Sequence, residues 1–411
     1  MKRKGIVFVS VITFFFMCGV VFSCKTGDNK AVADCEITAP FDSLFSTIFT
    51  DPGAPGGVVI VCRGDSVVYN RSFGMADLDK NIPMSDSTMF NVASASKTYI
   101  TSAVIKLRDN GLLSLDDSLS RFFPEFNREV FDKVKLRHVL SHTTGLPDLR
   151  PRNADQWNEY VKEHQSPFGY GPDYLLYGRE EELREFFKTL KRLDFSPGSE
   201  FDCQDAPYLL LPLVIEQVGG KNFEVWMRKN IFEPAGLAET EYYDPSHPHE
   251  RMAHAYRPAT GNPAPGRFRS RDGRWDEQDY GETEFFLTRA DHGICTTPRE
   301  FIRWINSLYH GRVIAESSLR EVNRPVVGTD VDSVQYGLGL FVQDINSKPF
   351  KVFHSRNNGG FGIYEGVFPR QHLYYLIFAN RADWNRLETA EKVDSIFKSH
   401  KWLLPKQAIQ E

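Results

Sequence analysis

Ser94 and Lys97 are the two residues whose types and spacing indicate a chemical reaction. Residues three apart on a helix lie on the same face, so the lysine amine can reach the serine hydroxyl. A serine hydroxyl is a weak nucleophile until a neighbouring base removes its proton, and a neutral lysine can be that base. The pair therefore predicts acyl transfer, with Ser94 forming an ester and Lys97 accepting the serine proton.

The residues that follow the pair predict the helix that positions it. Apolar side chains recur at helical spacing over 100–107, and Asn110-Gly111 is a typical helix end. Ser94 would lie in the first turn, where backbone N–H groups and the helix dipole favour the oxyanion of acyl transfer. A second Ser-x-x-Lys sequence, Ser395 to Lys398, lies inside a predicted helix with no preceding turn. We interpret that copy as two solvated surface residues.

Two stretches resemble one known superfamily. The sequence Phe-Asn-Val-Ala-Ser-Ala-Ser-Lys-Thr, from Phe90 to Thr98, is similar to the nucleophile motif of serine β-lactamases and penicillin-binding proteins. The run from Leu136 to Pro147 resembles a further signature of the class C β-lactamase-related branch, which also contains esterases and D-aminopeptidases. The resemblance extends from about Phe41 to Leu403. It implies an α/β (α+β) fold of the β-lactamase/transpeptidase-like type, with an antiparallel sheet flanked by helices and a mainly helical subdomain.

The second motif of this superfamily is altered. In the superfamily, a tyrosine lies six residues after the proline of a Pro-Gly pair, and a small residue and an asparagine or aspartate follow it. Counted from Pro197, these places hold Cys203, Gln204 and Asp205. The resemblance implies that Cys203 and Asp205 are catalytic. A thiol titrates near ~8.5 and a phenol near ~10, so acidity does not exclude Cys203. Its shorter reach matters more, because proton transfer requires hydrogen-bond distance.

The third motif is altered as well. It should contain His or Lys, a small residue and Gly, and here it reads His354-Ser355-Arg356. The resemblance implies that His354 is catalytic. Alternate residues of a strand share a face, so we expect His354 and Arg356 to face the cleft. Arg356 would then either bind an anionic group of the substrate or fill the cleft. By resemblance, the backbone N–H of Asn357 is the second oxyanion donor.

Predicted strands lie near both ends of the chain, with helices between them. A hairpin is predicted over 58–69 and three strands over 351–355, 362–368 and 374–380, which indicates one antiparallel sheet. The predicted parts of the chain are a signal peptide (1–23), a lipidated cysteine with a tether (24–39), and one β-lactamase-related domain (40–405), divided into an α/β part (about 40–92 and 293–405) and a mainly helical part (about 93–292).

The N-terminus predicts export. A basic start is followed by the apolar run 5–22 and then by Ser23-Cys24, which resembles a bacterial lipoprotein cleavage box. We expect Cys24 to carry a lipid that anchors the protein to the membrane of the bacterial cell envelope, outside the cytoplasm. Cleavage with release, or an uncleaved anchor, are the alternatives. The remaining cysteines are too scattered to form a disulfide framework.

Composition and histidine spacing narrow the possible partners. The net charge of −5 gives no reason to expect nucleic acid. His138 and His142 are interpreted as structural, and the histidines over 247–254 lack zinc-site spacing. We expect no metal and no cofactor. The expected partner is a small-molecule or peptide substrate, and the sequence does not predict the oligomeric state.

Three interpretations follow. The first is a serine hydrolase that acts on an ester, amide or peptide through an acyl-enzyme at Ser94. The second is a catalytically impaired homologue that binds ligands at the cell envelope, because Cys203 and Arg356 replace the usual Tyr and Gly. The third, a purely structural lipoprotein, explains neither the Ser-Lys pair nor the cleft motifs. We favour the hydrolase.

Overall fold

The computed structural model describes residues 29–147, 180–244, 249–260, 268–277, 289–290, 293–345, 348–358, 360–381 and 383–403. For residues 29–37, 181–182, 344–345, 348–350 and 356–358 it describes the backbone only. The predicted signal peptide and Cys24 lie outside the described residues.

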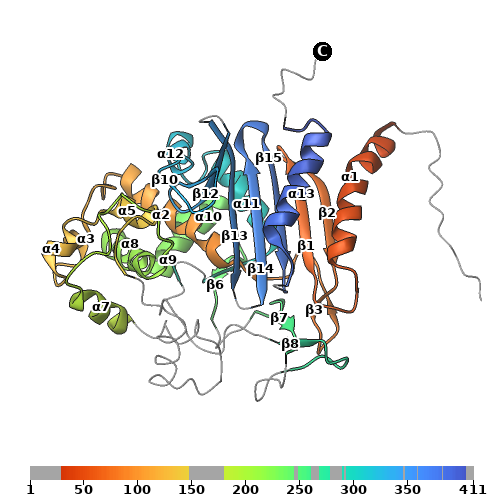
Figure 1. The fold of residues 1–411 in the computed structure, drawn as a ribbon, viewed down its shortest axis with the longest axis horizontal. Coiled ribbons are helices and arrows are strands. Elements are labelled where there is room, and N and C mark those ends of the chain that lie inside the picture. Colours follow the sequence, from red (N-terminus) through yellow and green to blue (C-terminus); the bar gives the residue numbers. More distant parts are fainter. Residues whose placement is uncertain are drawn as a thin grey trace, which may run out of the picture.

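An eight-stranded antiparallel sheet forms the centre of the molecule (Figure 1). In spatial order its strands are β10 (Val327–Gly328), β11 (Val334–Tyr336), β12 (Phe341–Ile345), β13 (Lys348–Asn358), β14 (Phe361–Phe368), β15 (Leu373–Ala379), β1 (Gly57–Arg63) and β2 (Ser66–Phe73). β1 pairs with β15 from Gly57 opposite Ala379 to Arg63 opposite Leu373, so strands from the two ends of the chain meet. This confirms the predicted antiparallel sheet.

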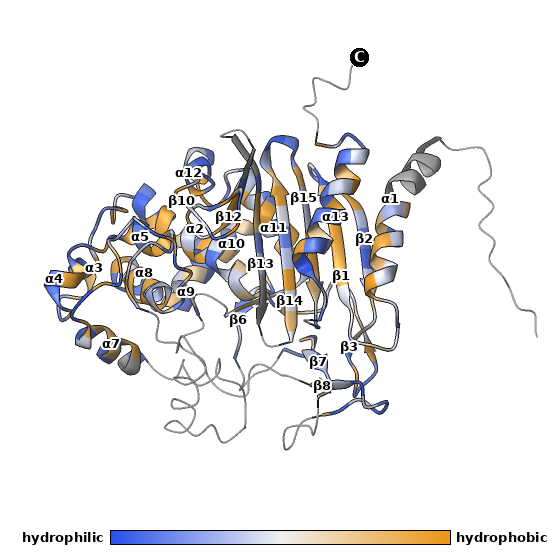
Figure 2. Ribbon diagram, viewed as in Figure 1, coloured by the Kyte–Doolittle hydropathy of each residue, from blue (hydrophilic) through white to orange (hydrophobic). Residues whose placement is uncertain are grey.

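Helices cover both faces of the sheet, and β1 shows the consequence. Val58 and Ile60 belong to the apolar cluster on one face, whereas Val59 and Val61 belong to the cluster on the other. A strand buried on both faces needs apolar residues at every position, which explains the continuous run Val58-Val59-Ile60-Val61. Figure 2 shows this hydrophobic run along β1.

Two terminal helices, α1 (Asn29–Ile48) and α13 (Arg386–Ser399), pack against one face of the sheet (Figure 1). Phe41 and Phe45 of α1 join Val393 and Phe397 of α13 in one apolar cluster with the strands. A partly buried ion pair between Lys351 of β13 and Asp394 of α13 adds a polar contact between the sheet and this helix.

Helix α1 begins at Asn29, inside the stretch predicted as a tether (24–39), and contains Pro40. Its first turns include Ala31, Ala33 and Glu36, which are favourable helix formers.

The apolar cluster on the opposite face of the sheet includes residues of α2 (Ser96–Asp109) and α11 (Pro298–Tyr309). The helices of the mainly helical part are α2, α3 (Leu119–Phe122), α4 (Arg128–Phe131), α5 (Leu136–Leu140), α7 (Glu180–Thr189), α8 (Leu211–Gly219), α9 (Phe223–Met227), a π-helical turn (Arg228–Phe232) and α10 (Glu233–Ala235), and α12 (Glu316–Val322) follows α11. α2 lies in the middle of this core, with Tyr99, Ile100 and Val104 fully buried. Helix α2 can therefore hold its first turn rigidly beside the sheet.

Three small sheets complete the described fold. They are β3 (Met75–Asp77) with β4 (Ile82–Pro83), β5 (Phe90–Asn91) with β9 (Ile294–Thr296) and β6 (Glu241–Tyr242), and β7 (Tyr256–Pro258) with β8 (Trp275–Glu277). Within the described ranges, no helix combines the length and apolar character needed to span a membrane.

Candidate active site

Ser94 lies on a tight turn between a strand and the central helix. The 3₁₀ turn Ala93–Ala95 connects β5 to α2, and Ala93 has a φ of 47°, in the left-handed region that residues other than glycine rarely adopt. The Asn91 side chain accepts a hydrogen bond from the Ala93 N–H at 2.9 Å, and the Val92 N–H donates to the Ile294 carbonyl of β9 at 3.0 Å. These bonds hold the strained turn, and thereby the position of the Ser94 hydroxyl.

Lys97 lies in the first turn of α2, as the spacing predicts. Its Nζ lies 3.3 Å from Ser94 Oγ and 2.9 Å from Asp205 Oδ1. The Lys97 and Asp205 side chains are 1% and 0% exposed, and Ser94 is 3% exposed. The structure therefore brings three of the predicted site residues together in a buried cluster.

Asp205 and Cys203 enter the site from the loop before the 3₁₀ helix Ala206–Leu210. Asp205 forms the ion pair with Lys97, whereas Cys203 is half-buried and its thiol is not part of a disulfide. Burial raises the pKa of Tyr208 above its usual range, and the charge of a Cys203 thiolate would raise it further, so Cys203 lies close to that ring.

Tyr208 is a site neighbour that the sequence did not reveal. The Lys97 Nζ lies 5.5 Å from the centre of its ring, and its hydroxyl forms a 2.8 Å hydrogen bond with Thr101. The ring of His142 stacks on Tyr208 with the ring centres 5.2 Å apart. Tyr208 therefore presents its π face to the lysine, and its hydroxyl is held by helix α2.

His354 lies on the face of β13 that the alternation predicts. It is buried, and its Nε2 lies 2.6 Å from the Gly339 carbonyl oxygen. A carbonyl only accepts hydrogen bonds, so Nε2 carries the proton. Gly339 has a φ of 80°, and a Cβ there would lie 2.2 Å from Thr101 Oγ1, so this turn requires glycine. The His354 side chain thus connects β13 to the turn at Gly339, which packs against Thr101 of α2.

Arg356 and Asn357 are described by their backbone alone. They lie in β13 opposite Ile363 and Gly362 of β14. Strand β13 packs against the turn that carries Ser94, so the backbone of this strand borders the nucleophile. The predicted roles of the Arg356 side chain and of the Asn357 N–H remain predictions.

Two further histidines have structural contacts. His138 Nδ1 accepts a hydrogen bond from the Lys135 N–H at 3.1 Å. Burial, with smaller contributions from the charges of Lys135 and Arg137, lowers the pKa of His138 to about 4, so it is neutral at pH 7. His142 stacks on Tyr208, as described above. These contacts agree with the structural interpretation of both residues, which stays a prediction, and His247 lies outside the described residues.

The beta-lactamase family model matches residues 41–395 of this sequence. The chain belongs to the beta-lactamase family. It is 25% identical over 354 residues to penicillin-binding protein 4* of Bacillus subtilis (strain 168), covering 85% of this chain and 72% of the relative. It is 28% identical over 237 residues to esterase EstB of Burkholderia gladioli, covering 57% of each protein.

The fold is shared with solved structures. A penicillin-binding protein from Bacillus halodurans aligns with a TM-score of 0.67 at 21% identity, covering 86% of this chain and 99% of that one. The β-lactamase/transpeptidase-like fold is therefore confirmed.

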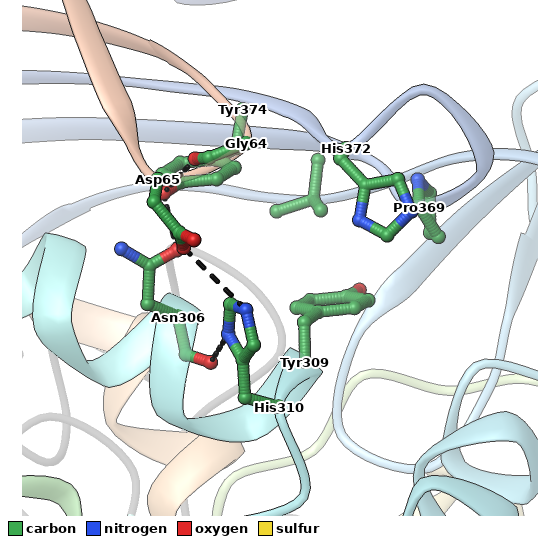
Figure 3. Close-up of a pocket in the computed structure, with 9 residues that line it drawn as sticks. Gly64, Asp65, Asn306, Tyr309, His310, Pro369, His372 and Tyr374 are labelled. Atoms are coloured by element: carbon green, nitrogen blue, oxygen red, sulfur yellow. Dashed lines mark hydrogen bonds and ion pairs between the residues drawn. The ribbon is translucent and has the colours of Figure 1, made fainter. Parts of the chain in front are cut away.

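A separate pocket of about 220 Å³ lies near the end of β14 that is away from Ser94 (Figure 3). Asp65 and His310 face each other across it, with His310 Nε2 3.4 Å from Asp65 Oδ1. Tyr374 lines the same pocket, and its hydroxyl donates a hydrogen bond to the Gly64 carbonyl oxygen at 2.9 Å. No member of the Ser94 cluster lines this pocket, so it is not the candidate active site.

Proposed function

We propose that this protein is a serine hydrolase that forms an acyl-enzyme at Ser94 and acts on an ester, amide or peptide outside the cytoplasm. One observation carries the proposal: Lys97 Nζ contacts both Ser94 Oγ (3.3 Å) and Asp205 Oδ1 (2.9 Å) in a buried site. A lysine within reach of a serine at a helix start is an arrangement that can activate the hydroxyl. The family relationship adds support.

Lys97 must be a neutral amine before it can accept the serine proton. The Asp205 carboxylate can take the proton of the Lys97 ammonium directly, because the two groups share a hydrogen bond. This transfer converts two buried charges into two neutral groups, which a low-dielectric site favours. In this proposal Asp205 therefore holds the proton that Lys97 gives up.

Acylation then proceeds with Lys97 as the general base. Ser94 Oγ attacks the acyl carbon while its proton moves to Lys97 Nζ, and an oxyanion forms on the former carbonyl oxygen. The Ser94 N–H at the helix start and the Asn357 N–H of β13 are the proposed donors to that oxyanion. On its collapse, the bond to the leaving group breaks, and Lys97 returns the proton to the leaving oxygen or nitrogen. Water releases the acyl group from Ser94 by the same route.

The second candidate function is an impaired homologue that binds ligands at the cell envelope. Its support is the replacement of the family tyrosine by Cys203, together with the hydrogen bond that fixes the Tyr208 hydroxyl on Thr101. In that case Ser94, Lys97 and Asp205 would form a buried polar network without turnover.

Hydrolysis of a panel of chromogenic esters distinguishes the two functions. The hydrolase proposal predicts turnover that Ser94→Ala abolishes. Ser395→Ala is the matched control, since Ser395 is exposed, belongs to the second Ser-x-x-Lys sequence, and donates to the Glu391 carbonyl at 2.8 Å. If the wild-type protein hydrolyses none of these esters, the result would favour the second candidate function, an impaired homologue that binds ligands.

A further inference from the structure

Glu365 is a buried carboxyl group that the proposed mechanism does not use. It lies on β14 directly opposite His354 of β13, and it is 7% exposed. Its Oε2 has no hydrogen-bond partner among the described residues. Buried polar atoms in folded proteins are almost always hydrogen-bonded, so an unpaired carboxyl oxygen requires a reason.

The side chains of Glu365 and His354 point to the same face of the sheet. Val352 of β13 and Val367 of β14 belong to the apolar cluster on the α2 side, and each lies two residues from His354 and Glu365 respectively. Phe353 and Tyr364 belong to the cluster on the opposite face. Directly opposed residues on one face of an antiparallel pair have Cβ atoms about 4.5–5.5 Å apart. Glu365 is therefore a neighbour of His354, one strand further from the site.

The groups around Glu365 do not stabilise its negative charge. Burial raises its pKa to about 8. From α2 it faces Tyr99 and from α11 Tyr309, two buried phenols whose pKa values are raised first by burial and also by the charge of Glu365. Its partner on β15 is the apolar Leu376. At neutral pH the carboxyl group thus keeps its proton.

We propose that Glu365 is a positioning residue of the candidate site, which acts through His354, its directly opposite neighbour on β13. The catalytic part of this inference rests on the proposed function, whereas the coupling to His354 does not. His354 donates from Nε2 to Gly339, so Nδ1 is the nitrogen whose protonation responds. Ionised Glu365 would favour the His354 imidazolium and would oppose an oxyanion formed at Ser94.

The coupling is tested by NMR titration of the full-length protein, with His354→Gln used to assign the imidazole signals. The His354 signals of the wild-type protein should show an inflection near pH 8, where Glu365 loses its proton. Glu365→Gln and the apolar Glu365→Leu should abolish this inflection. Two variants are used so that the misfolding of one does not end the test. An inflection that persists in a folded variant, or is absent from the wild type, overturns the coupling.

Hydrolysis tests the catalytic part. The wild-type rate should fall about tenfold from pH 7 to pH 9, because one protonated group near pH 8 is required, and Glu365→Gln should lose this decrease. Glu300→Gln is the control, since Glu300 is also buried but accepts hydrogen bonds from the Ala238 and Glu239 N–H groups. It should leave the pH profile unchanged. An identical decrease in Glu365→Gln contradicts the positioning role, and an inactive wild type contradicts the proposed function while the NMR result still stands.

Discussion

Lys97 Nζ lies 2.9 Å from Asp205 Oδ1, and both side chains are excluded from water. Removing one partner leaves the other polar group buried without its hydrogen bond, which destabilises a protein by about 1–3 kcal/mol. Lys97 is also within 3.3 Å of Ser94 Oγ. One contact thus serves both the stability of the site and the proposed proton transfer.

Asp205→Asn should separate these two effects. The amide can still accept a hydrogen bond from Lys97, but it cannot take the lysine proton. We expect the rate of hydrolysis to fall by about 10²–10⁴-fold, the usual contribution of a general acid or base. Unfolding by urea measures the stability of the same variant. Asp394→Asn, in the partly buried pair with Lys351 on the opposite face, should lower stability without changing the rate constant for hydrolysis. Unchanged hydrolysis in Asp205→Asn would show that the carboxylate is not needed.

Glu365 should make stability depend on pH. Its pKa is about 8 in the folded protein and 4.5 for the ordinary group, so between these values the unfolded chain ionises while the folded protein stays protonated. The contribution of this group to folding therefore becomes less favourable as pH rises through this window, by about 1.4 kcal/mol per pH unit, and levels off above pH 8.

Glu365→Gln should flatten this dependence and stabilise the protein at pH 8 relative to the wild type. Urea unfolding at pH 5, 6.5 and 8 measures the difference between the two proteins. A constant difference across the three pH values would contradict the raised pKa.

Arg356 should decide the charge preference of the cleft. Its backbone lies in β13, the strand that packs against the Ser94 turn. If Arg356 binds a substrate carboxylate, Arg356→Gly should weaken turnover of carboxylate-bearing esters about tenfold or more while sparing neutral esters, since a charged hydrogen bond contributes about 1.5–3 kcal/mol. If Arg356 instead fills the cleft, every ester should be turned over faster. Equal inertness toward both ester classes, with and without Cys203→Tyr, would contradict both roles.

The parts of the site that could be predicted are those encoded locally. Ser94 and Lys97 are three residues apart, and helix geometry alone brings them together. The strand alternation that places His354 is equally local. Tyr208, by contrast, reaches the site through a contact with Thr101, 107 residues earlier in the chain, which no local pattern reveals.

Local sequence patterns predict neither the positive φ of Ala93 nor the place of Glu365 in the fold. The backbone of Ala93 is held by Asn91 and β9, and an alanine gives no signal for a positive φ. Glu365 interrupts an otherwise apolar strand, which could have drawn attention to it. Its position opposite His354, however, depends on the strand register.

Cys24 should carry a lipid. The basic and apolar N-terminus ending in Ser23-Cys24 is the basis of this prediction, and these residues lie outside the described structure. The wild-type protein should partition into the detergent phase with an acylated mass, and Cys24→Ser should remain in the aqueous phase. A wild-type protein that matures without acyl mass would rule out the lipid anchor.

Intact-mass analysis after treatment with a fluorophosphonate tests the central claim most directly. Ser94 Oγ should attack phosphorus and displace fluoride, so the wild-type protein and Ser395→Ala should each gain one phosphonyl group, which peptide mapping assigns to Ser94. Ser94→Ala should gain none. No adduct on the wild-type protein, or an adduct that persists in Ser94→Ala on another residue such as Cys203, would contradict a nucleophilic Ser94.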